Sequence, residues 1–369
     1  MTELDALMVL NAVPGLGSAR IKKLLDQYGS AQRIFSLSES ALMADRIIPA
    51  NVIQNIFHFP KDNFLKNEYN LITPKDIKII TLKDENYPVN LREIAGAPVI
   101  LYVQGRIPQD NKLSVAIVGS RQASLYGITV AEQFAARLAE LGLTIVSGMA
   151  RGIDTAAHRA ALRAKGSTMA VMGCGLAHIY PPENKDLYRN IVEHGAVISE
   201  FPMETPPAGN NFPARNRIIS GLSLGVVVVE AALKSGALIT ADFALEQGRE
   251  VFAIPGKVDN PNSRGVHNLI KQGAKLATCV EDILEEIEPQ LSPCLKEQKK
   301  FEDIQEAPEI PAHLSDNEKL VYQYIKNQPV HIDALAEMCH VGISILASVL
   351  FQLEIKKLVR QLPGKMFVR

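Results

Sequence analysis

Hydrophobic and polar positions alternate along the middle of the chain in blocks of two kinds. From about residue 77 to residue 287, short apolar runs of strand length are separated by stretches of helical period. The runs are IKIITL, VILYVQG, LSVAIVGS, LTIVSGMA, STMAVMG, AVISEF, GVVVVEA, EVFAIPG and AKLATC. Their apolar residues are continuous, which is typical of strands buried on both faces. The pattern predicts an α/β fold in which a parallel sheet is flanked by helices.

The N-terminal part has no such runs. Residues 1–70 predict a small helical domain, in which a Pro-Gly-Leu-Gly hairpin precedes an amphipathic helix with Ser18 as its candidate cap. The hairpin indicates either a helix-hairpin-helix, whose glycine amides approach a DNA phosphate, or a tight turn in a helical bundle.

The C-terminal part begins with a polar stretch. Residues 289–312 carry four prolines and many charges, which predicts a linker. Residues 313–369 predict a winged helix with three helices and a hairpin around residues 363–365. The third helix, ISILASVLFQLEIKK, begins with apolar and small residues and carries its cations, Lys356 and Lys357, at its end. Because a base-reading helix needs polar side chains toward its N-terminal half, we expect this module mainly to contact protein.

Composition limits the possible functions. The 39 Lys and Arg residues and 40 Asp and Glu residues give a formal charge of −1, so any phosphate binding must come from a local cluster. The four cysteines form no CxxC pair, which predicts reduced thiols and no metal site. No apolar run reaches about 18 residues, and the N-terminus lacks the cationic region of a secretory signal. We therefore expect a cytoplasmic protein without membrane contact.

Glycine loops follow several of the predicted strands. The strand VAIVG leads into Gly119, Ser120 and Arg121 just before a helix. Free amides, the helix dipole and a bidentate side chain favour a phosphate there. The fingerprint GxGxxG does not follow this strand, so no nicotinamide cofactor is expected. After the next strand, Asp154 and His158 admit a catalytic pair, but we favour an N-cap aspartate beside a partly buried histidine.

The segment GNNFPARNR, residues 209–217, has neither helical nor strand period. Phe212 offers a flat apolar face, and Arg215, Asn216 and Arg217 offer donors, as on a surface that holds a nucleic-acid backbone while a base stacks. Because ligands gather at the carboxyl ends of parallel strands, we expect further cations beside this segment. They are Arg121, Arg151, Lys234, Lys257 and Arg264. So many cations suit a polyanion rather than a single phosphate.

Several segments together resemble the DNA-processing protein A (DprA/Smf) family. They are IVGSRQASLYG, SGMARGIDTAAHRAAL, GCGLAHIYPPEN, SEFPMETPP, NFPARNRIISGLS, SGALITADFALEQGREVFAIPG and GVHNLIKQGAKL, in this order over roughly residues 77–287. The resemblance implies an extended Rossmann-like domain that binds single-stranded DNA, between an N-terminal SAM or helix-hairpin-helix-like domain and a C-terminal winged-helix-like domain. It also implies a homodimer that loads the RecA recombinase onto incoming strands in natural transformation, with no enzymatic reaction and no cofactor. Carried onto this chain, it implies a DNA pocket of Gly119, Ser120, Arg121, Arg215, Asn216, Arg217 and Lys257, with Phe212 as the stacking residue.

Two other functions stay open. One is a nucleotide-processing enzyme of the Rossmann-like phosphoribohydrolase type. Those enzymes carry PGGxGTxxE, of which Gly236, Thr240 and Glu246 are a loose echo with different spacing. The other is a duplex-DNA regulator that works through the winged helix, against which the apolar third helix argues.

Overall fold

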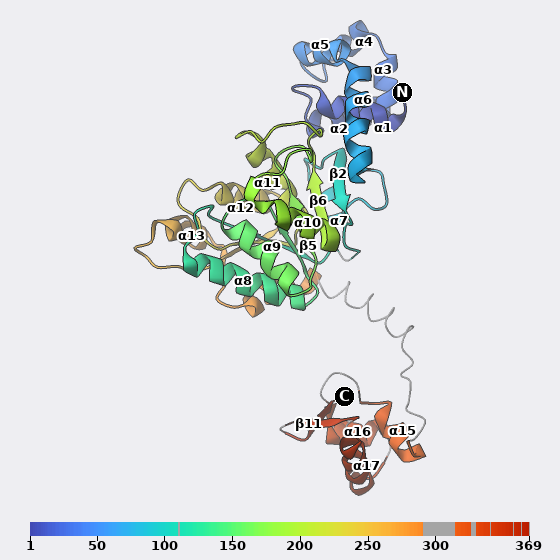
Figure 1. Ribbon diagram of the computed structural model, residues 1–369, viewed down its shortest axis with the longest axis vertical. Helices are drawn as coiled ribbons and strands as arrows, with labels where there is room; N and C mark the ends of the chain where they lie inside the picture. Colours follow the sequence, from blue (N-terminus) through green and yellow to red (C-terminus); the bar gives the residue numbers. More distant parts are fainter. Residues whose placement is uncertain are drawn as a thin grey trace. The chain divides into compact units, whose positions relative to one another are not determined.

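The chain folds into two compact units, Met1–Ser292 and Pro293–Arg369, each with its own hydrophobic core (Figure 1). The structure is a computed structural model that describes residues 1–109, 111–290, 314–325, 330–339, 341–356, 358–362 and 364–368. The predicted linker, residues 289–312, lies outside the described residues except for its first two.

A nine-stranded sheet forms the centre of the larger unit. Its strands are β1 (Lys78–Thr81), β2 (Ile100–Gly105), β3 (Ser114–Val118), β4 (Thr144–Ser147), β5 (Thr168–Val171), β6 (Gly195–Ser199), β7 (Gly225–Val228), β8 (Glu250–Ala253) and β9 (Lys275–Leu276). Their spatial order is β1-β2-β6-β5-β4-β3-β7-β8-β9. From β6 to β9 in this order all neighbours are parallel, as predicted.

The pairing of the first two strands differs from the predicted parallel sheet. β1 pairs antiparallel with β2, and β2 pairs antiparallel with β6. A parallel crossover needs a dozen or more residues, usually with a helix. The chain between β2 and β3 is short, and its described residues form no helix. Because β2 is reversed, its end lies at the edge where β3 begins, and the short loop suffices.

Helices cover both faces of the sheet. One face carries α8 (Leu125–Glu140), α9 (Ile153–Arg163) and α10 (Lys185–His194). The other carries α7 (Val89–Arg92), α11 (Asn211–Gly221), α12 (Gly236–Glu246) and α13 (Arg264–Lys271), which share one buried cluster. The connections from β3 through β4 and β5 to β6 contain α8, α9 and α10. The connections from β7 through β8 to β9 contain α12 and α13 and run toward the other edge of the sheet. Right-handed crossovers in opposite directions place the helices on opposite faces.

This topology fixes where a ligand binds. β3 has β4 on one side and β7 on the other, so the strand order reverses between β3 and β7. In open α/β sheets, ligands bind at the carboxyl ends of the strands at such a point. The arrangement confirms the predicted Rossmann-like core.

Six helices precede the sheet: α1 (Glu3–Ala12), α2 (Ser18–Tyr28), α3 (Ala31–Ser36), α4 (Glu39–Ala44), α5 (Ala50–His58) and α6 (Lys61–Ile72). They pack directly on the sheet, because Leu10 and Ile21 belong to the same buried cluster as Ile100 and Tyr102 of β2. The prediction that Ser18 caps α2 is wrong. The N-cap position is Gly17, and the buried Ser18 hydroxyl donates a hydrogen bond to Glu200 beyond β6 instead.

The smaller unit is a winged helix, as predicted. Its helices are α15 (Asp316–Tyr322), α16 (Ile332–Cys339) and α17 (Ile343–Ile355), and its sheet has the order β10-β12-β11. These strands are β10 (Val330–His331), β11 (Arg360–Leu362) and β12 (Met366–Val368). The predicted hairpin joins β11 and β12, although residue 363 lies outside the described residues. Throughout the part of the chain that is described, no helix has both the length and the apolar character to cross a bilayer.

Candidate nucleic-acid interface

A cleft of about 680 Å³ opens where the strand order reverses. Its walls come from the loops after β3 and β4, the first turns of α11, and the loop that leads into α12. Of the residues predicted for DNA binding, the cleft is lined by Gly119, Ser120, Arg121, Phe212, Arg215, Asn216 and Lys234. Arg151, Arg217 and Lys257 do not line it.

The loop after β3 is fixed in shape by its neighbours. A Cβ at Gly119 would lie 2.6 Å from the Ile153 side chain and 3.0 Å from the Glu230 carbonyl oxygen, so only glycine fits without displacement. The Ser120 amide donates to that carbonyl at 2.7 Å. The buried Glu230 carboxylate accepts hydrogen bonds from the Ser124 amide at 2.8 Å and the Ser124 hydroxyl at 2.5 Å. The loop is therefore preorganised, and it presents the exposed Arg121 at the mouth of the cleft.

Arg121 and two aromatic rings meet at this mouth. The guanidinium of Arg121 lies over the half-buried Phe212 ring, 5.0 Å from its centroid. Tyr180 stacks near the same ring at 5.7 Å with a tilt of 35°. The Phe212 ring also rests on Gly173, where a Cβ would lie 2.7 Å from a ring carbon. These contacts hold a flat apolar surface next to a cation, the pairing that binds a nucleobase and its phosphate.

The segment that carries Phe212 is helical, which corrects the expectation of an irregular loop. α11 begins at Asn211 and runs through Arg215 and Arg217 into buried Ile218. Pro213 lies in the first turn, where its missing amide has no intrahelical partner to lose. The asparagines and proline at the start resemble a turn, and the buried side of the helix begins with polar residues, so the helical period is hidden in the sequence.

Arg215 lies at the bottom of the cleft and is only 4% exposed. Its Nη1 donates to the carbonyl oxygen of Gly148 at 2.6 Å and to that of Val171, and its Nε donates to Asn216 Oδ1 at 3.2 Å. Gly148 directly follows β4, and Val171 ends β5. Burial lowers the pKa of Arg215 to about 10, so the side chain stays charged at neutral pH. Arg215 thus joins α11 to two strand ends and contributes positive potential under the cleft.

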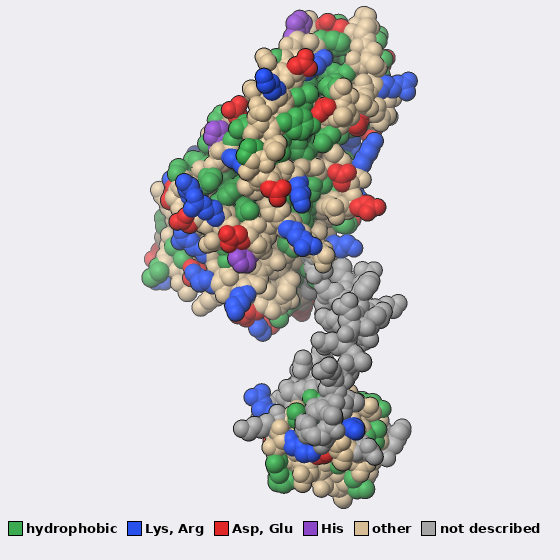
Figure 2. Space-filling view, turned by 45° about the vertical axis from the view of Figure 1, so that its right-hand side comes forward, with side chains coloured by type: hydrophobic (Ala, Val, Ile, Leu, Met, Phe, Trp, Pro, Cys, Tyr) green, Lys and Arg blue, Asp and Glu red, His purple; other side chains and the backbone are tan. Residues whose placement is uncertain are grey.

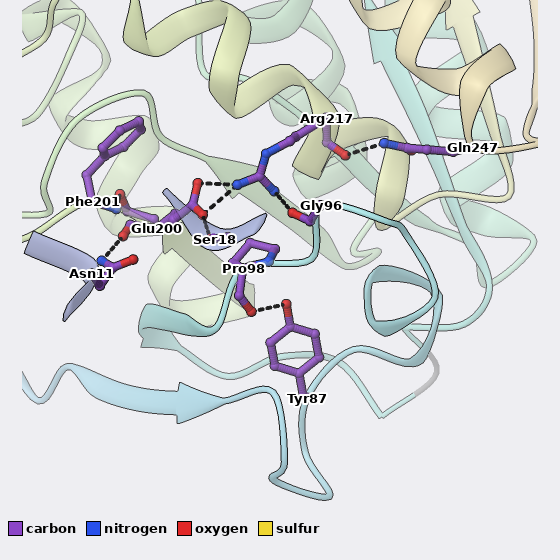
Figure 3. A network of polar contacts seen from close by, with 10 residues as sticks. Asn11, Ser18, Tyr87, Gly96, Pro98, Glu200, Phe201, Arg217 and Gln247 are labelled. Atoms are coloured by element: carbon purple, nitrogen blue, oxygen red, sulfur yellow. Dashed lines mark hydrogen bonds and ion pairs between the residues drawn. The ribbon is translucent and has the colours of Figure 1, made fainter. Parts of the chain in front are cut away.

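Arg217 does not line the cleft, and its guanidinium points toward Glu200 and Gly96, as Figure 3 shows. Two residues along a helix differ by about 200° in direction, so Arg215 and Arg217 lie on opposite sides of α11. Arg217 Nη2 binds both carboxylate oxygens of Glu200, at 2.5 and 2.6 Å, and Nη1 donates to the Gly96 carbonyl at 2.5 Å. Glu200 also accepts from Ser18, and its carbonyl accepts from Asn11 at 2.8 Å. This network, the Glu200 network, connects α11 to α1 and α2.

The remaining predicted cations lie around the cleft. Lys234 lines it beside the N-terminus of α12, where the Ser235 hydroxyl accepts from the Ala237 amide at 3.3 Å. Arg151 is exposed and forms an ion pair with Glu183. Lys257 is exposed in the loop after β8, and within the described residues its side chain has no ion-pair partner. Over the face seen in Figure 2, Lys and Arg are interspersed with Asp and Glu.

Sequence reasoning missed some members of the site. Tyr180, which flanks Phe212, and Asn262, which lines the cleft, were not singled out. A signal for Tyr180 exists in the YPPEN motif after the glycine loop of β5, where an aromatic residue precedes two prolines. Asn262 gave no comparable signal, because its place depends on how the long loop after β8 folds back to Gln122, whose carbonyl accepts from Asn262 at 3.0 Å.

Asp154 and His158 do not form a catalytic pair. The buried Asp154 carboxylate accepts from the amides of Gly148 at 3.1 Å and Ala150 at 3.3 Å, so it orders the loop before α9. The N-cap of α9 is Gly152, which corrects the capping role expected for Asp154. His158 is fully buried with its Nδ1 2.7 Å from the Thr168 hydroxyl. Burial, assisted by the Arg215 charge, lowers the pKa of His158 to about 3. Among the residues placed by the structure, no cluster of His, Cys, Asp or Glu could hold a metal ion.

Comparison with known proteins agrees with this architecture. The family described as DNA recombination-mediator protein A matches residues 78–288, and the DprA winged helix domain matches residues 305–365. The DNA processing protein DprA of Streptococcus pneumoniae is 41% identical over 274 residues, which cover 74% of this chain and 95% of that protein. Protein Smf of Escherichia coli is 41% identical over 293 residues, which cover 78% of this chain and 76% of that protein.

Solved structures extend the similarity to three dimensions. The X-ray structure of DprA from Streptococcus pneumoniae has a TM-score of 0.65 and 38% identity, and covers 78% of this chain and 98% of that chain. A structure of Helicobacter pylori DprA, described as showing a unique single-stranded DNA binding mode, has a TM-score of 0.52 and 29% identity, with 58% and 98% coverage. The chain therefore belongs to the DNA-processing protein A (DprA/Smf) family.

Proposed function

We propose that this protein binds single-stranded DNA in the cleft and acts as a non-catalytic recombination mediator. The observation that carries the proposal is the placement of the Arg121 guanidinium over the Phe212 ring at the mouth of the cleft. The single-stranded DNA binding described for the Helicobacter pylori relative supports it.

In this proposal the cleft holds the strand by two kinds of contact. A base takes the place of the Arg121 guanidinium on the Phe212 ring, and the freed guanidinium binds a phosphate in bidentate fashion. Lys234 and the Gly236 amide at the start of α12 bind a neighbouring phosphate, where the helix dipole favours negative charge. Gly119 and Ser120 let the backbone come close. None of these contacts reads a base edge, so binding is independent of sequence and falls with salt.

The other predicted residues have different parts in the proposal. Arg151 and Lys257 are exposed outside the cleft and contact phosphates beyond it. Arg215 and Asn216 act through the position of α11, because their side chains are engaged with protein groups. Arg217 holds α11 to the helical domain through Glu200.

We further propose that a homodimer carries the bound strand to the RecA recombinase in the cytoplasm, during natural transformation. The exposed apolar residues of α17 support a protein-binding role for the winged helix, because Ile343, Ile345, Phe351 and Ile355 are each more than half exposed. An apolar surface of this kind suits a protein partner better than the polar edges of a duplex. Gel filtration with light scattering tests the dimer, and the rate of RecA filament formation on protein-coated single strands tests loading.

The decisive experiment is a titration of fluorescent oligothymidine and of duplex DNA at two salt concentrations. Arg121→Ala should weaken oligothymidine binding about tenfold. The slope of log affinity against log salt concentration should become shallower by about 0.7, the value of one phosphate contact on a single strand. Arg137→Ala is the matched control, because Arg137 is an exposed arginine at the far end of α8 that pairs with Glu140. Equal affinity of the Arg121→Ala protein and its parent would overturn the cleft assignment.

A further inference from the structure

A second groove lies on the face that carries α9 and α10. It measures about 550 Å³ and is lined by Arg159, Leu162, Arg163, Asp186, Leu187, Asn190 and His194, which we call the α9/α10 groove. The two helices are neighbours on this face of the sheet (Figure 1). Its leucines provide an apolar floor, and its arginines, amide and imidazole provide polar walls. The groove therefore repeats the combination of apolar surface and fork-shaped donors found in the cleft.

α9 leads from the cleft into this groove. Ala150 and Asp154, at the start of the helix, line the cleft, and Arg151 lies exposed between them. With a rise of about 1.5 Å per residue, Arg159 and Arg163 lie roughly 9 and 15 Å along the helix from Ile153. They are four residues apart and share one side of α9. Arg151, in the loop beside the cleft, is thus followed along α9 by a line of two cations, Arg159 and Arg163.

The charges along this line are available to a ligand. Within the described residues Arg159 has no ion-pair partner. Arg163 pairs with Glu132 of α8 at 3.0 Å, and Asp186, the acidic residue of the groove, pairs with Arg189 at 3.4 Å. Arg163 is 60% exposed and Asp186 is 91% exposed. Exposed ion pairs contribute little free energy, so a phosphate can replace Glu132 as the partner of Arg163 at small cost.

The cleft is too small to hold all the nucleotides that a single-strand binding domain contacts. A pocket of several hundred cubic ångströms encloses a ligand of drug-like size, which corresponds to one or two nucleotides. Nonspecific single-strand binders contact about 4–16 nucleotides per domain. A strand held in the cleft must therefore continue over the surface, and the α9/α10 groove lies farther along the helix that begins beside the cleft.

We infer that the α9/α10 groove is a second single-stranded DNA subsite, which receives the strand after it leaves the cleft past Arg151. The inference rests on the proposed function of the cleft and adds the direction of the strand. Arg159 and Arg163 bind successive phosphates, and Leu162 and Leu187 carry the apolar face of a base.

The length of the bound strand separates the two subsites experimentally. Full-length protein is titrated with fluorescent oligothymidine of about 6 and of about 16 nucleotides, lengths inside the range that such proteins contact. The variant is Arg159→Gln/Arg163→Gln, and the control is Arg33→Gln/Arg137→Gln, which removes two exposed arginines outside both cavities. Thermal unfolding confirms that each variant folds.

The groove variant should bind the longer strand about 5- to 10-fold more weakly, with a salt slope shallower by about 1.4, and should bind the shorter strand as the parent does. Arg121→Ala should weaken both strands. Unchanged binding of the longer strand, or an equal loss on the shorter one, would overturn the groove subsite. An Arg121→Ala protein that binds both lengths like its parent would overturn the cleft, and with it the continuation proposed here.

Discussion

The Arg121 guanidinium and the Phe212 ring face each other at 5.0 Å, although one follows β3 and the other begins α11. Arg121 is exposed, whereas Phe212 is held from behind by Gly173 and flanked by Tyr180. The ring is thus fixed and the cation is free to move. This asymmetry suits a site where an incoming base displaces the cation and gains both a stacking surface and a phosphate ligand.

The first prediction concerns the ring itself. Phe212→Leu keeps an apolar side chain but removes the flat face, and stacking of one base is worth about 1–3 kcal/mol. Affinity for oligothymidine should therefore fall at least fivefold, while weak binding to duplex stays the same, as measured by fluorescence anisotropy. Phe212→Tyr keeps the ring and serves as the control, with affinity within about threefold of the parent. A Phe212→Leu protein that still prefers single strands would show that no base stacks there.

The second prediction concerns the contact between Gly148 and Arg215. A Cβ at Gly148 would lie 2.6 Å from Arg215 Nη2, and the guanidinium cannot withdraw because the carbonyl oxygens of Gly148 and Val171 hold it. Gly148→Ala should lower the free energy of unfolding by about 1–3 kcal/mol, the usual cost of overpacking. Urea denaturation measures it. Gly209→Ala is the control, since nothing lies within 4 Å of the added carbon, and an equal loss in both variants would contradict the assignment.

The third prediction is a pH dependence of stability that comes from His158. The unfolded chain protonates this histidine near pH 6.5, whereas burial lowers its pKa to about 3 in the folded protein. Between these values the unfolded state binds more protons, so acidification favours unfolding. The His158 contribution is complete above pH 6.5 and is lost as pH falls toward 3, at up to about 1.4 kcal/mol per pH unit.

The variant His158→Asn isolates this contribution. Asparagine keeps a polar atom near Thr168 but does not titrate. Burial raises the pKa of Asp154, which acts with the opposite sign because its folded form binds a proton more readily. That opposing effect is present in both proteins and cancels in the difference. Urea unfolding from pH 7.5 to 4.5 should give a shallower slope for the variant, and parallel curves would show that His158 titrates normally.

The sequence predicted the sheet and its glycine loops well, for a physical reason. Strands buried on both faces need continuous apolar runs, and sharp turns after them need glycine. Both features can therefore be recognised from neighbouring residues in the sequence. Gly119, Ser120 and Arg121 follow directly from the end of β3, and the structure places them in the cleft. The reversed direction of β2 is not a local property, because it depends on which strand edges it finds.

The sequence did not predict that Arg215 and Arg217 lie on opposite sides of one helix. In an irregular loop both could reach one ligand, and their neighbours Asn211 and Pro213 favoured a loop. Once the segment is a helix, residues two positions apart face opposite ways, and only one side meets the cleft. The buried partners of both arginines come from segments distant in sequence, and no periodicity could reveal them.

The last prediction tests whether Arg217 contacts DNA or holds the helical domain. Its side chain and that of Glu200 are 17% and 11% exposed, and breaking a buried ion pair costs about 3–5 kcal/mol. Arg217→Met should therefore lower the free energy of unfolding by roughly 3 kcal/mol, at the low end because some solvent contact remains. Ser18→Ala removes one hydrogen bond to the same carboxylate and should cost about 1.5 kcal/mol.

Both Glu200-network variants should also loosen α1 and α2 from the sheet, which faster proteolysis of the N-terminal helices would report. Oligothymidine affinity, measured well below the unfolding midpoint, should stay within about threefold of the parent because neither side chain reaches the cleft. Arg137→Met controls for loss of one arginine at an exposed site. The opposite result would be unchanged stability and a tenfold loss of DNA binding in Arg217→Met. It would show that Arg217 contacts DNA and that its ion pair with Glu200 opens when the strand binds.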